Sequence, residues 1–305
     1  MDLSLSVTPK ISDLERLAES FISDETGVFN HVNTDRLSAR IPVIMLTARV
    51  DDGHVDIDLS PENVLAVVNT KLLKCYSFCP LAVPMVRVLK RIVKAFDVNN
   101  PAKGSLSSYG YVLMVLNYLQ KSNIIPNLQE LAFAKNDQIV RVDPSAHSSP
   151  LAHPRNKSFV CNVHFLCPTQ QAQLDILRRF LGQMAAQNKG DNLLLHLAQF
   201  FFYYAFVFDY RHQVVGSSIN KQMKAENDPE YYHTRSGEFA IEDPFETFYN
   251  VGHVLKHSQS CRIRICFAIC YTKIVDLVND AMKGGSPSLS MKFVVEELLR
   301  SATTS

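Results

Sequence analysis

The stretch Gly104-Ser105-Leu106-Ser107-Ser108-Tyr109-Gly110-Tyr111-Val112-Leu113-Met114 joins a short polar turn to an apolar run. The turn signal Asn99-Asn100-Pro101 stands just before it. After the serines, the pattern is helical, and we predict a helix over residues 107–120. We therefore expect this stretch to begin a helix, with Tyr111 the better candidate than Tyr109 for a core aromatic.

Helical patterns also lie on both sides of this stretch. Upstream, the predicted helices cover residues 69–76 and 81–96 and are separated by Cys79-Pro80. Downstream, the predicted helices cover residues 174–186, 191–208, 245–255 and 291–299, while residues 263–278 fit either a strand or a helix. The chain after residue 60 is therefore expected to be mostly helical.

The N-terminal part has a different pattern. Period-two alternation predicts strands at residues 3–7, 41–47 and 54–59, and a helical pattern covers residues 11–22. Residues 1–60 are thus expected to form a small α/β unit. Two polar segments, 136–158 and 220–240, are expected to be loops, the first a long surface loop or an insertion.

Composition limits the class of protein. The chain has 305 residues, of which 47% are hydrophobic, and can bury a sizeable core. Its 31 basic and 30 acidic residues give a net charge of +1, so any contact with RNA must be local. The seven cysteines show no paired spacing and fit a reducing compartment, with core positions rather than zinc ligands as their expected role. The apolar segment 193–208 is short for a membrane span, and we expect no membrane association.

Residues 104–114 resemble the G-[TS]-L-S-S-Y-[GA]-Y-V-L-M signature of the family of terminal uridylyltransferases and template-independent poly(A) RNA polymerases, in the DNA polymerase beta-like nucleotidyltransferase superfamily. Three further segments that resemble the family occur in family order: Asn69-Thr70-Lys71-Leu72-Leu73, Phe208-Asp209-Tyr210 and Ile241-Glu242-Asp243-Pro244-Phe245-Glu246. The resemblance extends from residue 1 to about residue 257.

This resemblance implies an α+β fold with two domains. A truncated nucleotidyltransferase palm sheet would occupy residues 1–60, and a mostly helical central domain would occupy residues 61–305. The central domain would include a poly(A)-polymerase-associated region at about 190–257 and an inserted loop at 136–158. The active site is expected in the cleft between the two domains.

The family binds two divalent ions, Mg²⁺ or Mn²⁺, roughly 4 Å apart, through aspartates on neighbouring strands. Asp58 has the spacing of the family's third aspartate, and Asp56, on the same strand face, is the alternative. Asp2-Leu3 resembles the end of the D-x-D-L motif, which makes Asp2 a catalytic and metal-binding candidate.

If Asp2-Leu3 corresponds to the end of the D-x-D-L motif, the family's first aspartate and its Gly-Ser helix start would precede Met1. We therefore expect an RNA uridylyltransferase-type enzyme that is inactive if those elements are missing. A catalytically dead pseudoenzyme that binds RNA or a partner is the corresponding alternative.

The resemblance also assigns the residues that bind the nucleotide. Lys90 and Lys94, one helical turn apart, would contact the triphosphate, although such a pair by itself is more often a solvated face. Ser108 would donate a hydrogen bond to phosphate, and Tyr109 would stack on the base. Tyr109 could instead be a core aromatic.

Asn69 would bond a ribose hydroxyl, or else cap a helix, and Thr70 is assigned to the same nucleotide site. Asp243, together with Glu246, would read the base edge directly or through water. Tyr249 stands where the best-known uridine-specific members have a histidine, and His253 is a turn too far along to replace it. The choice between uridine and adenine stays open at this point.

Taken together, the resemblance implies template-independent addition of UMP from UTP to RNA 3′ ends, in the cytoplasm or in a mitochondrion. Poly(A) or mixed-nucleotide addition from ATP is the nearest alternative. A basic cluster near the C-terminus is expected to be a solvated face rather than an RNA track; its members are Lys256, His257, Arg262 and Arg264.

Overall fold

The computed structural model describes residues 2–5, 11–24, 26–37, 42–61, 64–132, 139–142, 159–167, 175, 178–179, 182, 192–216, 239–246, 249–284 and 289–304. The chain forms two compact units, which are described separately. The first comprises Met1–Lys71 and Ala134–His164, and the second comprises Leu72–Phe133 and Phe165–Ser305. The boundary predicted at residue 60 therefore differs from the structural boundary, and residues 134–164 group with the first unit.

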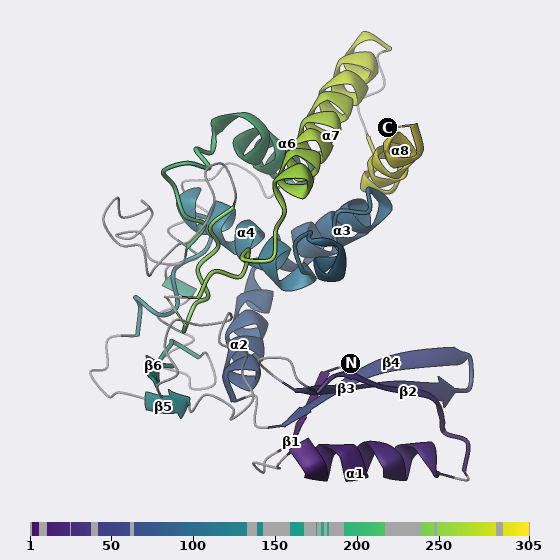
Figure 1. The fold of residues 1–305 in the computed structure, drawn as a ribbon. Coiled ribbons are helices and arrows are strands. Elements are labelled where there is room, and N and C mark those ends of the chain that lie inside the picture. Colours follow the sequence, from purple (N-terminus) through teal and green to yellow (C-terminus); the bar gives the residue numbers. More distant parts are fainter. Residues whose placement is uncertain are drawn as a thin grey trace. The chain divides into compact units, whose positions relative to one another are not determined.

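The first unit contains a sheet of strand order β1-β4-β3-β2 (Figure 1). Its strands are β1 (Asp2–Leu5), β2 (Phe29–Arg36), β3 (Val43–Val50) and β4 (Gly53–Pro61). β1 pairs parallel with β4, whereas β3 pairs antiparallel with both β4 and β2. The three predicted strands overlap β1, β3 and β4, which confirms the expected α/β unit.

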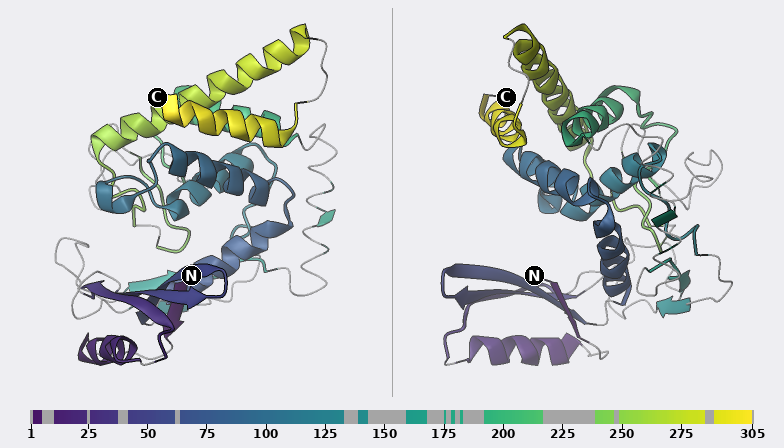
Figure 2. Two further views of the ribbon diagram at one scale, coloured as in Figure 1. Left: turned by 90° about the vertical axis from the view of Figure 1, so that its right-hand side faces the viewer. Right: turned by 180° about the vertical axis from the view of Figure 1, so that it is seen from behind.

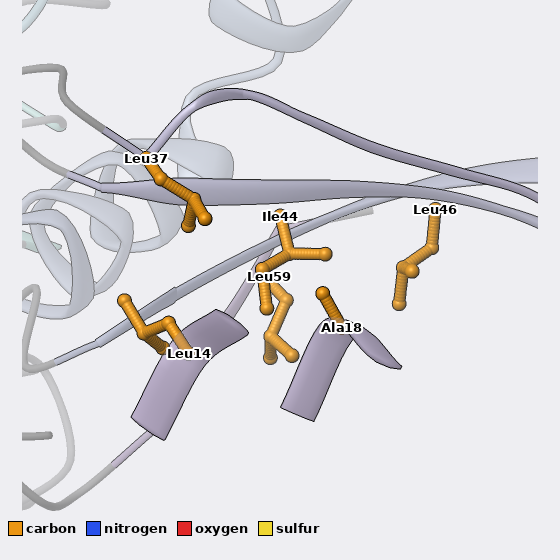
Figure 3. Packing of buried hydrophobic residues seen from close by; sticks show 6 residues of the cluster. All are labelled: Leu14, Ala18, Leu37, Ile44, Leu46 and Leu59. Carbon is orange, nitrogen blue, oxygen red and sulfur yellow. The ribbon is translucent and has the colours of Figure 1, made fainter. Parts of the chain in front are cut away.

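One face of this sheet is covered by α1 (Ile11–Ile22), as the views in Figure 2 show. Leu14 and Ala18 are four residues apart and project from one side of α1, because a helix repeats every 3.6 residues. They meet Ile44 of β3 and Leu59 of β4 in a buried cluster (Figure 3). Full burial of a leucine side chain stabilises a fold by about 1.5–3 kcal/mol. The predicted helix at residues 11–22 is confirmed.

The sequence analysis missed β2, the strand at the edge of the sheet. Its sequence, FNHVNTDR, lacks apolar alternation, and only Phe29 and Val32 pack against the core cluster. Its pairing with β3 is also interrupted by register shifts. An edge strand needs few buried side chains, so its apolar pattern is too weak to identify from the sequence.

A separate two-stranded sheet joins β5 (Ile139–Val142) to β6 (Phe159–Asn162). The loop predicted at residues 136–158 is therefore wrong at Ile139–Val142, where a β-branched run forms a strand. The rest of that predicted loop lies outside the described residues.

The second unit is helical. Its α-helices are α2 (Val64–Cys75), which crosses the unit boundary, α3 (Ala82–Ala95), α4 (Ser108–Lys121), α6 (Leu193–Phe202), α7 (His257–Lys283) and α8 (Met291–Thr304). Short 3₁₀ turns occur at η1 (Tyr76–Phe78) and η2 (Pro101–Lys103), and a π-helical turn, η3 (Tyr203–Val207), follows α6. Figure 2 shows α8 running alongside α7. The α+β fold class is confirmed.

Helix α4 lies at the centre of the second unit. Nearly every residue from Gly110 to Gln120 is buried. The Tyr204 hydroxyl of η3 lies 3.0 Å from Met114 O and 3.0 Å from Asn117 Oδ1, and its single proton is shared between these two acceptors. The middle of α4 is therefore held by a buried hydrogen-bonding tyrosine.

Two further segments with a predicted helical pattern, residues 263–278 and 245–255, differ in the structure that they form. Residues 263–278, which fit either a strand or a helix, lie inside α7. The helix predicted at residues 245–255 is wrong, because the described part of that segment consists of bridges and turns. The helix predicted at 174–186 and the loop predicted at 220–240 lie almost wholly outside the described residues.

Among the described helices, no single one is long and apolar enough to cross a membrane. One pair of segments, Val64–Phe78 and Ala82–Ala95, meets the length and composition requirement only when both are taken together across a bend of 115°.

Candidate active site

Strand β4 separates apolar from acidic side chains. Ile57 and Leu59 pack toward the α1 core. Asp56 and Asp58 alternate with them and so belong to the opposite face of the sheet. Asp56 is exposed, and its Oδ1 accepts a hydrogen bond from Thr47 Oγ1 at 3.0 Å. Asp58 is half-buried and forms no hydrogen bond or ion pair with another described residue, so the two carboxylates differ in environment.

The pairing of β1 with β4 brings a second acidic position to Asp58. The register partners are Asp2 and Asp58 in the parallel pair, while Met45 of β3 stands opposite Asp58 on the other side. Neighbouring strands lie about 4.8 Å apart, which suits two carboxylates that share divalent ions. The donor chemistry fits Mg²⁺ or Mn²⁺. Within the described residues, no group of three or more metal-ligating side chains occurs.

Asn69 and Thr70 lie in the interior of α2. Asn69 is the sixth residue of that helix and is half-buried, so the alternative role of helix cap is wrong. Thr70 is exposed and donates its hydroxyl to Ala66 O at 2.8 Å, one turn back in the same helix. Because consecutive helical residues point about 100° apart, a single small ligand group would meet one of these side chains rather than both.

Lys90 and Lys94 lie on the exposed side of α3. The opposite side of this helix carries buried residues, among them Leu89, Ile92 and Val93. Neither lysine forms an ion pair with another described residue. The two ammonium groups are therefore placed, by their four-residue spacing, to meet one anionic group in solution.

The turn before α4 depends on Gly104. This residue has φ of +84°, in the left-handed region that favours glycine. A Cβ built there would come within 2.6 Å of the Lys256 side chain. The backbone joins the same two residues, because Lys256 N donates to Gly104 O at 2.9 Å. The glycine of the signature is thus explained by backbone conformation and close packing.

The next residues of the signature anchor the turn to the core. Ser105, 1% exposed, donates its hydroxyl to Val98 O, and Tyr111 donates to the same carbonyl at 2.6 Å. Leu106 is fully buried. The expectation that Tyr111 is a core aromatic is confirmed.

Ser107 and Ser108 differ in role. Ser107 is the N-cap of α4, and its hydroxyl oxygen accepts from Gly110 N at 3.2 Å. Ser108 is half-buried, and its Oγ accepts from the side-chain amide of Asn99 at 3.0 Å. Because Asn99 supplies this donor, the Ser108 hydroxyl proton can be directed to another acceptor.

Tyr109 is bonded to Asp243. Its hydroxyl donates to Asp243 Oδ2 at 2.9 Å. Burial, followed by the nearby Asp243 carboxylate, raises the pKa of Tyr109 well above its ordinary value, so the hydroxyl stays protonated. The ring is half-buried rather than enclosed in the core. This hydrogen bond fixes the orientation of the ring and brings together two predicted site residues that are 134 residues apart.

Asp243 also organises the segment around it. Its Oδ1 accepts from the backbone N–H groups of Phe245 at 2.9 Å and Glu246 at 3.0 Å. The loop closes as Tyr249 N donates to Glu246 O at 2.7 Å and Asp243 N donates to Tyr249 O at 3.2 Å. Asp243 and Glu246 are 3% and 5% exposed. These contacts explain why residues 245–255 do not form a helix: the aspartate bonds the backbone groups in a turn instead.

Tyr249 and His253 lie beside each other, with ring centroids 5.2 Å apart. His253 Nδ1 lies 2.9 Å from Asn250 O, and we assign the ring proton to this nitrogen because a carbonyl only accepts. Tyr249 is half-buried, and it belongs to the surroundings that raise the pKa of Tyr109. The structure therefore gathers Tyr109, Asp243, Glu246 and Tyr249 into one cluster, which we call the base-side cluster.

Three residues of this region were missed by the sequence analysis. Asn99 bonds Ser108, Gln129 donates to Pro244 O at 2.7 Å, and Asn250 Oδ1 accepts from Ile241 N at 3.0 Å. Only Asn99 had a signal, as part of the Asn-Asn-Pro turn. The other two act on backbone groups that are distant in sequence, and no motif marks such contacts.

The basic cluster near the C-terminus has partly structural roles. Arg262 donates to Phe96 O at 3.1 Å, and Arg264 lies 5.1 Å from the ring centre of the buried Tyr210. In the same Phe208-Asp209-Tyr210 segment, His212 lies 2.6 Å from Asp209 and lowers the pKa of that exposed carboxyl.

Two parts of the chain match models of known protein families. Residues 192–247 match the family model described as Cid1 family poly A polymerase. Residues 1–78 match the model described as Poly(A) RNA polymerase, mitochondrial-like, central palm domain. The first match falls in the region expected at about 190–257, and the second extends past the expected palm domain of residues 1–60.

Individual relatives cover more of the chain. Terminal uridylyltransferase cid1 of Schizosaccharomyces pombe is 33% identical over 246 residues, covering 74% of this chain and 53% of that protein. Poly(A) RNA polymerase GLD2 of Mus musculus is 29% identical, covering 69% of this chain and 37% of that protein. The chain thus spans about half of the first relative's length and a smaller part of the second.

A solved structure of the Cid1 poly(U) polymerase with magnesium and 3′-dATP bound has a TM-score of 0.65 and 28% identity, covering 98% of this chain and 80% of that one. Its fold, the two family models and the uridylyltransferase relative all indicate the family that the signature at residues 104–114 resembles. The chain therefore belongs to the family of terminal uridylyltransferases and template-independent poly(A) RNA polymerases.

Proposed function

We propose that this chain is a template-independent RNA nucleotidyltransferase that adds UMP from UTP to RNA 3′ ends. The observation that carries the proposal is the register of β1 and β4, which pairs Asp2 with Asp58 away from the α1 core. Asp58 is preferred to Asp56 because it has this acidic register partner, whereas Asp56 is bonded to Thr47.

Asp2 and Asp58 would hold the divalent ions, Mg²⁺ or Mn²⁺. When bound, such ions neutralise charge on the phosphates and help an RNA hydroxyl to act as a nucleophile. Paired carboxylates are the ligands that these hard cations prefer. The relative with magnesium and 3′-dATP bound supports this assignment.

The reaction forms one phosphorus–oxygen bond and breaks another. The RNA 3′-oxygen attacks the α-phosphorus of the nucleotide and loses its proton, while pyrophosphate leaves. Lys90 and Lys94 would bind the triphosphate of the incoming nucleotide through charge-assisted contacts. Ser108 would donate its hydroxyl to a phosphate oxygen, because Asn99 already supplies a donor to its Oγ.

The nucleoside part would be held by α2 and the base-side cluster. Asn69 would bond a ribose hydroxyl, and Tyr109 would stack on the base in the orientation that Asp243 fixes. Thr70 donates to its own helix, which makes it the weaker member of the assigned nucleotide-binding set.

Base choice would fall to Asp243, Glu246 and Tyr249. Oδ1 of Asp243 accepts two backbone bonds and Oδ2 accepts the Tyr109 hydroxyl, so a direct contact with the base would have to share the Oδ2 atom. The Tyr249 hydroxyl can both donate and accept, which suits the O4 and N3–H edge of uracil.

Addition of AMP from ATP is the second candidate. Tyr249 favours it because this residue replaces the histidine that uridine-specific members carry, and the match to GLD2 points the same way. The cellular site of action, cytoplasm or mitochondrion, remains a prediction from the family.

The test is a nucleotide-addition assay on a short single-stranded RNA with Mg²⁺ or Mn²⁺. UTP, ATP, CTP and GTP are supplied separately to the full chain. We expect addition with UTP to be fastest, and removal of the metal by a chelator to stop it. Faster addition with ATP would establish the second candidate.

A binding measurement in parallel separates the remaining alternative. If UTP and RNA both bind but no nucleotide is added under any condition, the proposal of enzymatic activity is wrong. The chain would then act as an RNA-binding pseudoenzyme.

A further inference from the structure

Two cysteines far apart in sequence lie face to face in the second unit. Cys75 ends α2, and Cys167 follows β6. Their sulfur atoms are 3.4 Å apart, with the Cys75 thiol donating to Cys167 Sγ, across a sequence separation of 92 residues. Both side chains are half-buried, so a small oxidant can reach them. Neither residue belongs to the nucleotide chemistry proposed above.

The neighbours of these cysteines hold the two sulfurs in place. The Tyr76 hydroxyl accepts from Leu128 N at 3.2 Å, and Leu128 O accepts from Leu166 N at 2.8 Å. Tyr76, Leu128 and Leu166 are all buried. A chain of hydrogen bonds therefore runs from the residue after Cys75 to the residue before Cys167, and the close approach of the sulfurs is built into the core.

The position of the pair in the chain is also distinctive. The chain passes between the two units after Lys71, after Phe133 and after His164. Cys75 stands just past the first of these crossings, and Cys167 stands just past the third. A covalent bond between them would join two of the segments by which the chain connects its units.

The other cysteines whose side chains the structure describes lack this combination. Cys79, Cys266 and Cys270 are buried in the core, where an oxidant cannot reach them. Cys261 is exposed, and its sulfur lies 3.8 Å from the His257 ring nitrogen Nε2. Cys261 is therefore a suitable control for general thiol oxidation.

We propose that Cys75 and Cys167 form a reversible disulfide when the protein meets a peroxide. In the first step the Cys167 sulfur attacks one peroxide oxygen; the oxygen–oxygen bond breaks, an alcohol or water leaves, and Cys167 becomes a sulfenic acid. In the second step the Cys75 sulfur displaces the hydroxyl group, which leaves as water with the Cys75 proton. The peroxide is reduced by two electrons, and the two thiols are oxidised to the disulfide.

The order of the two steps follows from the environment of Cys75. Burial, and then the hydrogen bond to Cys167, raise the pKa of the Cys75 thiol to about 12. Cys75 therefore keeps its proton near neutral pH, and a protonated thiol is a poor nucleophile toward peroxide. Cys167, whose sulfur accepts the hydrogen bond from Cys75, is therefore the sulfur that reacts first.

The experiment treats the full chain with an equimolar amount of hydrogen peroxide. Remaining thiols are then blocked with iodoacetamide, and the protein is digested and mapped by mass spectrometry without reduction. We expect a cross-linked peptide that contains Cys75 and Cys167, and its loss after dithiothreitol. The cross-link should be absent from Cys75→Ser and Cys167→Ser and present in the control Cys261→Ser.

The proposal would be overturned if Cys75 and Cys167 were both recovered as alkylated thiols while Cys261 was oxidised. Cross-linking of Cys75 to any other cysteine would do so as well. A second measurement needs no variant: the oxidised wild-type chain should unfold at a higher temperature than the reduced chain, since the bond closes a long loop. If the oxidised chain unfolds at the same temperature as the reduced chain or at a lower one, the proposed bond between the two segments is contradicted.

Discussion

Asp58 lies on a regular strand whose acidic face is separate from the α1 core, whereas Tyr109 lies in the first turn of α4, next to a segment whose polar side chains are almost all engaged. The strand is held by its apolar face, so its carboxylate remains available for chemistry. The turn is held by its own polar groups: Ser105 and Ser107 bond the backbone, and Tyr109 bonds Asp243. An acidic residue of the strand can thus be changed with little cost to the fold, whereas Tyr109 combines function with stability.

The largest effect should come from Asp58→Ala. We expect nucleotide addition to fall about a thousandfold, because a lost metal ligand removes several kcal/mol of transition-state stabilisation. UTP binding and the thermal unfolding midpoint should change little, since no hydrogen bond to a described residue is lost. Single-turnover kinetics and UTP titration measure the two parts.

Asp56→Ala is the matched control, because it removes a carboxylate from the same face of the same strand. It should retain most of the activity. If Asp56→Ala loses activity while Asp58→Ala retains it, Asp56 rather than Asp58 is the metal ligand.

Replacement of both Lys90 and Lys94 by alanine should have the next largest effect. Two charge-assisted contacts to phosphate, worth about 1.5 kcal/mol each, correspond to a rise of about a hundredfold in KM for UTP. The difference in KM between the wild type and the double variant should become smaller as salt is added, because salt screens exposed charges. The fold should be unaffected, since both side chains are exposed.

Arg91→Ala supplies the control for this pair. Arg91 is also exposed on α3 and is turned about 100° from Lys90 and about 60° from Lys94 around the helix axis. An equal rise in KM in this variant would show that the lysines act only through the general charge of α3.

Two variants of Tyr109 should separate its contribution to UTP binding from its contribution to the stability of the fold. Tyr109→Ala should raise KM for UTP about thirtyfold, from roughly 2 kcal/mol of lost base stacking. Tyr109→Phe should keep the stacking but leave the buried Asp243 without its hydroxyl donor, and should lower the free energy of unfolding by roughly 1–3 kcal/mol. Steady-state kinetics and urea denaturation separate the two effects.

The raised pKa of Tyr109 determines the pH dependence expected for this site. Because burial and Asp243 raise the pKa of Tyr109, its hydroxyl keeps its proton and its hydrogen bond throughout the alkaline range in which the protein folds. Tyr109→Phe should therefore alter the level of activity but add or remove no titration between pH 6 and about 10. A lost alkaline limb in Tyr109→Phe would contradict the assigned protonation state.

The smallest effect is expected at Asn99. Asn99→Ala should raise KM for UTP only a few-fold, because it releases the orientation of Ser108 without removing the hydroxyl. In the double variant with Ser108→Ala, the cost should be no greater than that of Ser108→Ala alone. Additive costs would show that Asn99 acts independently of Ser108.

Much of the fold could be predicted from local pattern. The helix at residues 11–22 has a clear apolar stripe, and β4 alternates between core and acidic positions, so both were found with nearly correct bounds. The edge strand β2 was missed because an edge strand buries few side chains, and the strand β5 was missed because it has only four residues within a polar stretch. The helix predicted at 245–255 failed because Asp243 and Asn250 bond backbone groups in turns, which the apolar spacing does not reveal.

By itself, the sequence determined the family signature, the alternation that separates Asp58 from the core and the spacing of Lys90 and Lys94, since each depends on residues near one another in the chain. Only the tertiary structure decided that Asp2 pairs with Asp58, that Tyr109 is oriented by Asp243, and that Cys75 meets Cys167. The reason is physical: strand register and contacts between distant segments are set by how whole elements pack, and that packing cannot be read from the residues at either end of the contact.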